Sequence, residues 1–297
     1  MSANAAGCDL LLPVLSIYAL ILGDGMSHQH MPGIHTNEDS ERFRAGAAKY
    51  AAYLNTIEGR LRIDLAFASL QEFLPQASIS ALDVGCGTGV ATVRLAQLGL
   101  HVTLLDESLP MLDLAMCAAQ EAGVTEKITL KHGNAVEIAD FFGASFDVIV
   151  CHNILEYVDH PFAVLRGAAR TLRNSSSVLS VVVRNQAGEV LKTAIKDGDL
   201  AASERNLTAE WAHESLYGGK VRVFTAESLR SMLAAASLEV IAERGVRVLS
   251  DYLPATVSQN DEYQKIFELE RKLGRRPEFA AIARYTQCLA RRAGSSV

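Results

Sequence analysis

The chain has 297 residues, of which 49% are hydrophobic and 21% are charged, a composition suited to one large α/β domain with an accessory subdomain. Its formal net charge of −6 opposes a surface built mainly to bind phosphate backbones, although a local basic patch is compatible with it. No CxxC pair occurs, which favours reduced thiols in a cytoplasmic compartment; the five cysteines are Cys8, Cys86, Cys117, Cys151 and Cys288.

Residues 1–40 are expected to form a flexible or helical appendage. The apolar run at residues 10–22 is too short to span a membrane, contains Pro13 and follows no Lys or Arg. We therefore expect no membrane anchor, and rank a helical appendage before a start at Met26 or Met31 and before a signal peptide. No metal site is expected, because the clustered histidines fit a flexible tail; these are His28, His30 and His35.

Residues 41–78 are interpreted as a helical lid, and residues 79–184 as a cofactor-binding core. Short apolar strands are expected at residues 79–84, 101–105, 128–131, 146–151 and 178–183. Residues with helical periodicity lie between them, at 90–98, 110–122 and 163–172. This alternation predicts right-handed βαβ units and a parallel sheet with helices on both faces.

After Arg184 the chain becomes polar and charged, and residues 185–223 are interpreted as a cap insertion or mobile segment rather than sheet. Residues 224–297 are expected to supply the remaining strands and the C-terminal helices. A helix is predicted at 226–236, strands at 238–242 and 247–249, and a helix at 261–273. The predicted fold is therefore α/β, a Rossmann-like doubly wound sheet with a helical N-terminal lid and a small C-terminal cap.

The most informative motif is Leu-Asp-Val-Gly-Cys-Gly-Thr-Gly at residues 82–89, where an acidic strand end meets alternating glycines and then a helix. Glycines allow a sharp turn and a close approach of the backbone to a ligand at the carboxyl edge of a parallel sheet. Asp106 ends the next predicted strand, as a ribose-binding carboxylate should.

This string resembles motif I of class I S-adenosylmethionine-dependent methyltransferases, which implies that fold, that cofactor and methyl transfer. In such enzymes the glycines line the methionine and ribose, and the acid after the second strand binds the ribose hydroxyls. The cofactor-binding residues that the resemblance implies are Asp83, Gly85, Cys86, Gly87, Gly89, Asp106, Glu107, Met111, Asn134, Ala135 and His152.

A closer resemblance, over roughly residues 43–290, is to the bacterial tRNA 5-carboxymethoxyuridine methyltransferases, which methylate a carboxylate on a wobble uridine. The matching segments are residues 59–62, 152–158, 245–248, 251–253, 268–270 and 283–285. The first of them implies that Arg62 reaches the cofactor, at its carboxylate. The chain departs from the family at residues 201–210, where two acids and one base replace a basic segment.

Methyl transfer from a sulfonium requires an in-line nucleophile and no metal. The candidate catalytic residues are His152, Asn153 and Tyr157, and the candidate substrate residues are Arg247, Tyr252 and Arg284. A carboxylate acceptor is already nucleophilic near neutral pH and suits bidentate arginines. A hydroxyl or amine acceptor would instead use His152 as general base.

We expect a methyltransferase acting on a small molecule, with carboxylates among the acceptors considered. The alternatives are methylation of a tRNA wobble uridine, an S-adenosylmethionine-consuming cyclase that releases methylthioadenosine, and a non-catalytic cofactor-binding module.

Overall fold

The structure is a computed structural model that describes residues 46, 49–76, 80–213, 219–254, 256–257 and 261–294. The predicted appendage of residues 1–40 lies outside these ranges, as do the start of the predicted lid and Ile79. Within the described ranges, no helix has both the length and the apolar character needed to cross a membrane.

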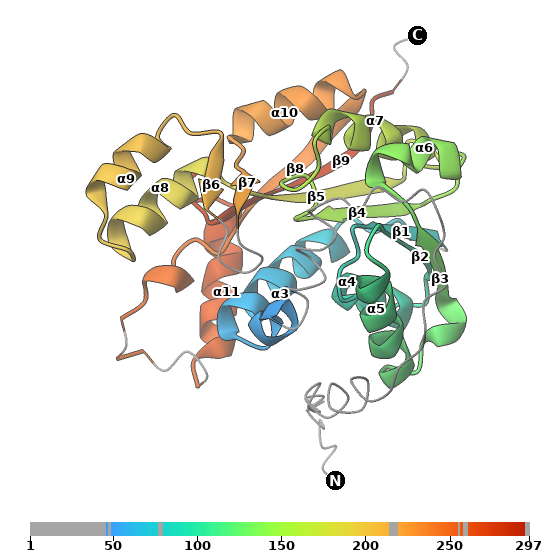
Figure 1. Ribbon diagram of the computed structural model, residues 1–297, viewed down its shortest axis with the longest axis horizontal. Helices are drawn as coiled ribbons and strands as arrows, with labels where there is room; N and C mark the ends of the chain where they lie inside the picture. Colours follow the sequence, from blue (N-terminus) through green and yellow to red (C-terminus); the bar gives the residue numbers. More distant parts are fainter. Residues whose placement is uncertain are drawn as a thin grey trace, which may run out of the picture. The chain divides into compact units, whose positions relative to one another are not determined.

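A seven-stranded sheet forms the centre of the fold, in the order β3-β2-β1-β4-β5-β9-β8 (Figure 1). Five strands pair in parallel: β1 (Ser80–Val84), β2 (His101–Asp106), β3 (Ile128–His132), β4 (Val148–His152) and β5 (Val178–Arg184). The last strand, β9 (Tyr285–Arg292), lies antiparallel between β5 and β8 (Leu238–Val246). The strand order reverses between β1 and β4, and open parallel sheets bind ligands at such a point.

Helices cover both faces of this sheet (Figure 1). One face carries α3 (Ile57–Gln71), α4 (Val90–Gln97), α5 (Leu109–Glu121) and α11 (Tyr263–Gly274). The other face carries α6 (Ile138–Phe141), α7 (Pro161–Thr171) and α10 (Ala226–Ala235). A sheet covered on both faces explains why its central strands are continuously apolar rather than alternating. The predicted doubly wound fold is confirmed.

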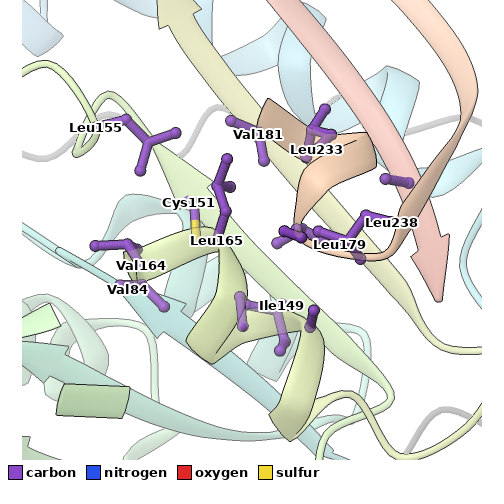
Figure 2. Close-up of a cluster of buried hydrophobic side chains, with 14 of the residues drawn as sticks. Val84, Ile149, Cys151, Leu155, Val164, Leu165, Leu179, Val181, Leu233 and Leu238 are labelled. Atoms are coloured by element: carbon purple, nitrogen blue, oxygen red, sulfur yellow. The ribbon is translucent and has the colours of Figure 1, made fainter. Parts of the chain in front are cut away.

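The largest apolar cluster lies between the sheet and the two helices α7 and α10 (Figure 2). Ile149, Cys151 and Leu179 point from β4 and β5 toward Leu165 of α7 and Leu233 of α10, and all five are fully buried. On the opposite face, alternate residues of the same strands pack against α3, α4 and α5. These two packed layers hold the strand ends in fixed positions.

Several element boundaries differ from the sequence prediction. The predicted strand at 247–249 is wrong, because β8 ends at Val246 and Arg247 takes a left-handed conformation with φ of 62°. The carboxylate of Glu270 then accepts hydrogen bonds from three successive backbone N–H groups, those of Val248, Leu249 and Ser250. These groups are consequently unavailable to a neighbouring strand. Strand β9 had no counterpart among the predicted strands.

The segment after β5 contains regular structure. It includes a small two-stranded sheet, whereas no sheet was predicted for residues 185–223. Helices α8 (Gln186–Ile195) and α9 (Leu200–Asn206) are followed by β6 (Trp211–His213) and β7 (Lys220–Arg222), which pair antiparallel. Short segments complete the described chain: η2 (Thr125–Lys127), η3 (Ala135–Glu137), η4 (Ser250–Tyr252) and α12 (Pro277–Ala280). We call residues 185–223 the cap.

The packing of α7 on the sheet predicts a large stability effect for Leu165→Ala. Removing this fully buried side chain leaves a cavity, and should lower the free energy of unfolding by about 3 kcal/mol. Urea denaturation followed by circular dichroism measures the change. Leu200→Ala, at a side chain that is 73% exposed, is the matched control and should change stability by less than about 0.5 kcal/mol.

Candidate active site

The glycine loop after β1 depends on backbone conformations that other residues rarely adopt. Gly85, Gly87 and Gly89 have φ of 64°, 53° and 76°. A Cβ atom at Gly85 would lie 2.6 Å from Ile154, and one at Gly89 would lie 2.7 Å from Ala115. At Gly87 the nearest atom would be 3.7 Å away, in the ring of Tyr50. The loop therefore packs tightly on both sides and leaves space only above Gly87.

Two carboxylates hold this loop in place. Asp106, at the end of β2, accepts hydrogen bonds from the backbone N–H of Gly87 at 3.0 Å and of Ser108 at 2.9 Å. Asp83 lies beneath the loop and accepts a hydrogen bond from the Thr92 hydroxyl at 2.6 Å. Burial raises the pKa of Asp83 to about 6 and also raises the pKa of Asp106. Both side chains are thus oriented by the protein itself.

A cavity opens beside the loop, at the carboxyl ends of β1 and β4. Nine of the predicted site residues line it: Arg62, Asp83, Gly85, Cys86, Gly87, Met111, His152, Asn153 and Tyr157. Gly89, Asp106, Glu107, Asn134 and Ala135 are not part of its lining. Glu107 and Asn134 instead contact each other, with the Asn134 amide 3.2 Å from Glu107 Oε2. We call this space the first cavity.

A partly buried polar network lines the first cavity. Arg62, from α3, donates to Asn153 Oδ1 at 3.1 Å and to the Tyr50 hydroxyl at 2.8 Å. Asn153 Nδ2 and the backbone N–H of Arg184 both donate to Glu156 Oε1, each at 2.8 Å. Asn153 takes a left-handed conformation with φ of 56°, which asparagine tolerates better than most residues. The network ties α3 to the ends of β4 and β5.

His152 is half-buried at the end of β4, with its Nε2 atom 2.8 Å from the Ser180 hydroxyl. Burial, and then the nearby positive charge of Arg62, lower its pKa to about 3. Its imidazole is therefore neutral at neutral pH and only weakly basic. This environment does not favour the general-base role considered for His152.

A second and larger cavity, of about 620 Å³, lies between the helix at residues 49–54, the cap and the segment after β8. Its buried wall carries three arginines, Arg184, Arg247 and Arg284, and two carboxylates that pair with them, Glu189 and Asp251. Two of the predicted substrate residues, Arg247 and Arg284, are thus brought together, whereas Tyr252 is not part of the lining. The rim carries acids as well as bases: Glu58, Asp197, Asp199, Lys192 and Lys196.

Arg184 and Tyr285 are the two described residues that line both cavities. They pair with each other across the sheet, as the last residue of β5 and the first of β9. Neither was among the predicted site residues. Arg184 could have been found from the sequence, because it ends a predicted strand at the ligand-binding edge, but Tyr285 begins the strand that was missed.

The fold and the glycine-loop site define a class I S-adenosylmethionine-dependent methyltransferase. The chain belongs to the methyltransferase domain family, whose model matches residues 57–243. This assignment confirms the expected enzyme class and S-adenosylmethionine as the cofactor.

Among curated relatives, the tRNA 5-carboxymethoxyuridine methyltransferase of Escherichia coli (strain K12) is 27% identical over 247 residues, covering 80% of this chain and 90% of the relative. A ubiquinone biosynthesis O-methyltransferase of Paracidovorax citrulli is 30% identical over 176 residues, covering 59% of this chain and 68% of the relative.

Two solved structures share the fold. A methyltransferase in complex with the Trm112 methyltransferase activator of Haloferax volcanii has a TM-score of 0.59 at 17% identity, covering 87% of this chain and 99% of that chain. An S-adenosylmethionine-dependent methyltransferase of Thermotoga maritima has a TM-score of 0.56 at 14% identity, covering 85% and 99%.

The contacts of Asp106 predict that Asp106→Ala weakens cofactor binding. Loss of the carboxylate frees the Gly87 N–H and removes a candidate ribose ligand, so the dissociation constant for S-adenosylmethionine should rise about tenfold to a hundredfold. Isothermal titration calorimetry measures this. Asp113→Ala, at an exposed position of α5, is the matched control, and equal affinities in both variants would contradict the assignment.

The lowered pKa of the half-buried His152 predicts a loss of stability in acid. The unfolded chain takes up a proton on this side chain below about pH 6.5, whereas the folded chain does so near pH 3. Its contribution is therefore complete above pH 6.5 and is lost as pH falls toward 3, at up to about 1.4 kcal/mol per pH unit. Urea denaturation of the wild type and His152→Asn at a series of pH values should show a shallower acid slope for the variant. Parallel slopes would contradict this.

Proposed function

We propose that the protein transfers the methyl group of S-adenosylmethionine to a carboxylate oxygen of a small acceptor, forming a methyl ester. The observation that carries this proposal is the wall shared by the two cavities. Arg184 and Tyr285 line both spaces, and Arg247 and Arg284 lie on the side of the second cavity. Buried guanidinium groups at the border of a cofactor cavity suit a planar anion.

The residues of the first cavity fit the cofactor. Space above Gly87 allows a ligand to approach the loop, and Asp106 is held at the neighbouring strand end. Arg62 is buried beside this space and, among the described residues, pairs with no carboxylate. A buried guanidinium in that position suits the carboxylate of the cofactor's methionine. When bound, S-adenosylmethionine supplies an electrophilic methyl group.

A carboxylate acceptor places few chemical demands on the protein. It is ionised near neutral pH, so no base must remove a proton from it, and positioning is the main contribution required. The arginines of the second cavity can bind and orient it. This fits the site better than an amine or a hydroxyl acceptor, because His152 is a weak base in its half-buried position.

The charge of the cap favours a small acceptor over a polynucleotide. Residues 185–223 contain five Lys and Arg and six Asp and Glu, which provides no basic surface for phosphates. The second candidate is a carboxylate carried on a tRNA wobble uridine. The similarity to the tRNA 5-carboxymethoxyuridine methyltransferase of Escherichia coli, which extends across most of both chains, favours this second candidate.

The test is to incubate the protein with S-adenosylmethionine, first alone and then with a panel of small carboxylic acids or with unmodified and carboxymethoxyuridine-containing tRNA. Mass spectrometry identifies the products. A methyl ester of a small acid is the expected result. An ester formed solely on tRNA would instead establish the second candidate, a carboxylate on a wobble uridine, as the acceptor. Methylthioadenosine without an acceptor would indicate a cyclase, and bound but unchanged cofactor throughout would indicate a binding module.

The position of Arg247 on the buried wall of the second cavity predicts that Arg247→Lys impairs use of the acceptor. Lysine keeps the charge but loses the planar fork, so kcat/KM for the methylated acid should fall about tenfold to a hundredfold. Cofactor affinity should stay unchanged, because Arg247 does not line the first cavity. Arg230→Lys, at an arginine that pairs with Glu243 outside both cavities, is the matched control. Equal kcat/KM in the two variants would rule out this role.

A further inference from the structure

Tyr285 occupies a position in which one side chain can reach both substrates. It begins β9, is 5% exposed, and lines the first and the second cavity. Its partner at this border, Arg184, also holds an ion pair with Glu189. A hydroxyl on Tyr285 is therefore available where an acceptor in the second cavity would meet the cofactor in the first.

Positive charge surrounds Tyr285 from several elements. The guanidinium carbons of Arg62 and Arg247 lie 5.8 Å and 5.9 Å from its ring centroid. Arg184 and Arg284 also act on its hydroxyl electrostatically. Among the described residues, Glu189 and Asp251 are the carboxylates that pair with these arginines of the second cavity: Arg184, Arg247 and Arg284. The border between the cavities thus favours an additional anion.

Tyr53 lines the second cavity together with Tyr285 and is hydrogen-bonded to Arg247. Arg247 Nη1 donates to the Tyr53 hydroxyl at 3.0 Å. Burial, and then the neighbouring Tyr285, raise the pKa of Tyr53 to about 12, so the Tyr53 hydroxyl keeps its hydrogen at neutral pH. Tyr285 lines both cavities, so the hydrogen of its own hydroxyl can reach a ligand there.

We propose that Tyr285 binds the acceptor directly, donating its hydroxyl hydrogen to the carboxylate oxygen that does not receive the methyl group. This inference rests on the proposed function and extends it, because it names a residue that selects a carboxylate. The arginines supply charge, and Tyr285 supplies a hydrogen bond at the border of the two cavities. A neutral amine has a single lone pair, which must attack the methyl group, so it offers no second acceptor for Tyr285 and no negative charge for the arginines.

The same surroundings make this hydrogen bond sensitive to pH. The four arginines outweigh the effect of burial and lower the pKa of Tyr285 to about 8. Below that pH the hydroxyl keeps the hydrogen that it donates, and above it the phenolate repels the acceptor. The KM for the carboxylate should consequently rise as pH increases through about 8. Other titratable groups that line the two cavities close to these arginines are Tyr50, Tyr53, His152, Glu156, Glu189 and Asp251.

The first experiment follows tyrosinate absorbance of the free protein between about pH 6 and pH 10. One tyrosine should titrate near pH 8 in the wild type and in Tyr263→Phe, a control at a tyrosine on α11 outside both cavities, but not in Tyr285→Phe. A large excess of acetate, the simplest carboxylate probe, should move this titration to higher pH. A wild type without such a titration, or one that acetate leaves unchanged, contradicts the proposal.

The second experiment measures kinetics with a carboxylic acid that the acceptor panel shows to be methylated. In Tyr285→Phe, KM for the acid should rise about tenfold to a hundredfold, with a smaller change in kcat, and the rise of KM above pH 8 should disappear. An unchanged KM and pH profile would overturn the proposal while leaving carboxylate methylation intact. Conversely, a Tyr285 titration that responds to acetate, without methylation of any acid, would overturn the proposed function alone.

Discussion

The burial of four arginines at one end of the sheet is the constraint on which the site depends. A buried guanidinium is costly unless hydrogen bonds and opposite charges surround it, so neighbouring elements must supply partners. The cap supplies Glu189, the segment after β8 supplies Asp251, and the helix at residues 49–54 supplies Tyr50 and Tyr53. These distant parts of the chain are therefore held together around the border of the two cavities.

The remaining architecture serves to present this border. The parallel strands β1 and β4 end beside the glycine loop, and the antiparallel strand β9 places Tyr285 opposite Arg184. Glu270 fixes the turn after β8 through three backbone hydrogen bonds, and this turn carries Arg247. A carboxylate in α11 thus positions an arginine of the second cavity without contacting it in any described hydrogen bond or ion pair.

Division into two cavities suits a group transfer between two charged molecules. The first cavity contains the glycine loop and a buried arginine, and its histidine is kept neutral by burial and by that arginine. The second has three arginines and two carboxylates on its buried wall, and mixed charges at the rim. Because electrostatic interactions strengthen where water is excluded, the buried wall and not the rim dominates binding of an anion. The protein can therefore recognise an acidic acceptor despite its overall negative charge.

By itself, the sequence determined the doubly wound core and the glycine loop, because these depend on local patterns of apolar strands, helix periodicity and turn residues. The resemblance of that loop to motif I then implied the cofactor. The sequence also named Arg62, Arg247 and Arg284 as candidate site residues. Tertiary structure decided how they are grouped: Arg62 faces the first cavity, and the other two face the second. Strand β9 and the role of Tyr285 arise from an antiparallel pairing of residues about a hundred positions apart, such as Arg184 with Tyr285. Partial burial of His152, which makes it a weak base, likewise results from packing that no local pattern records.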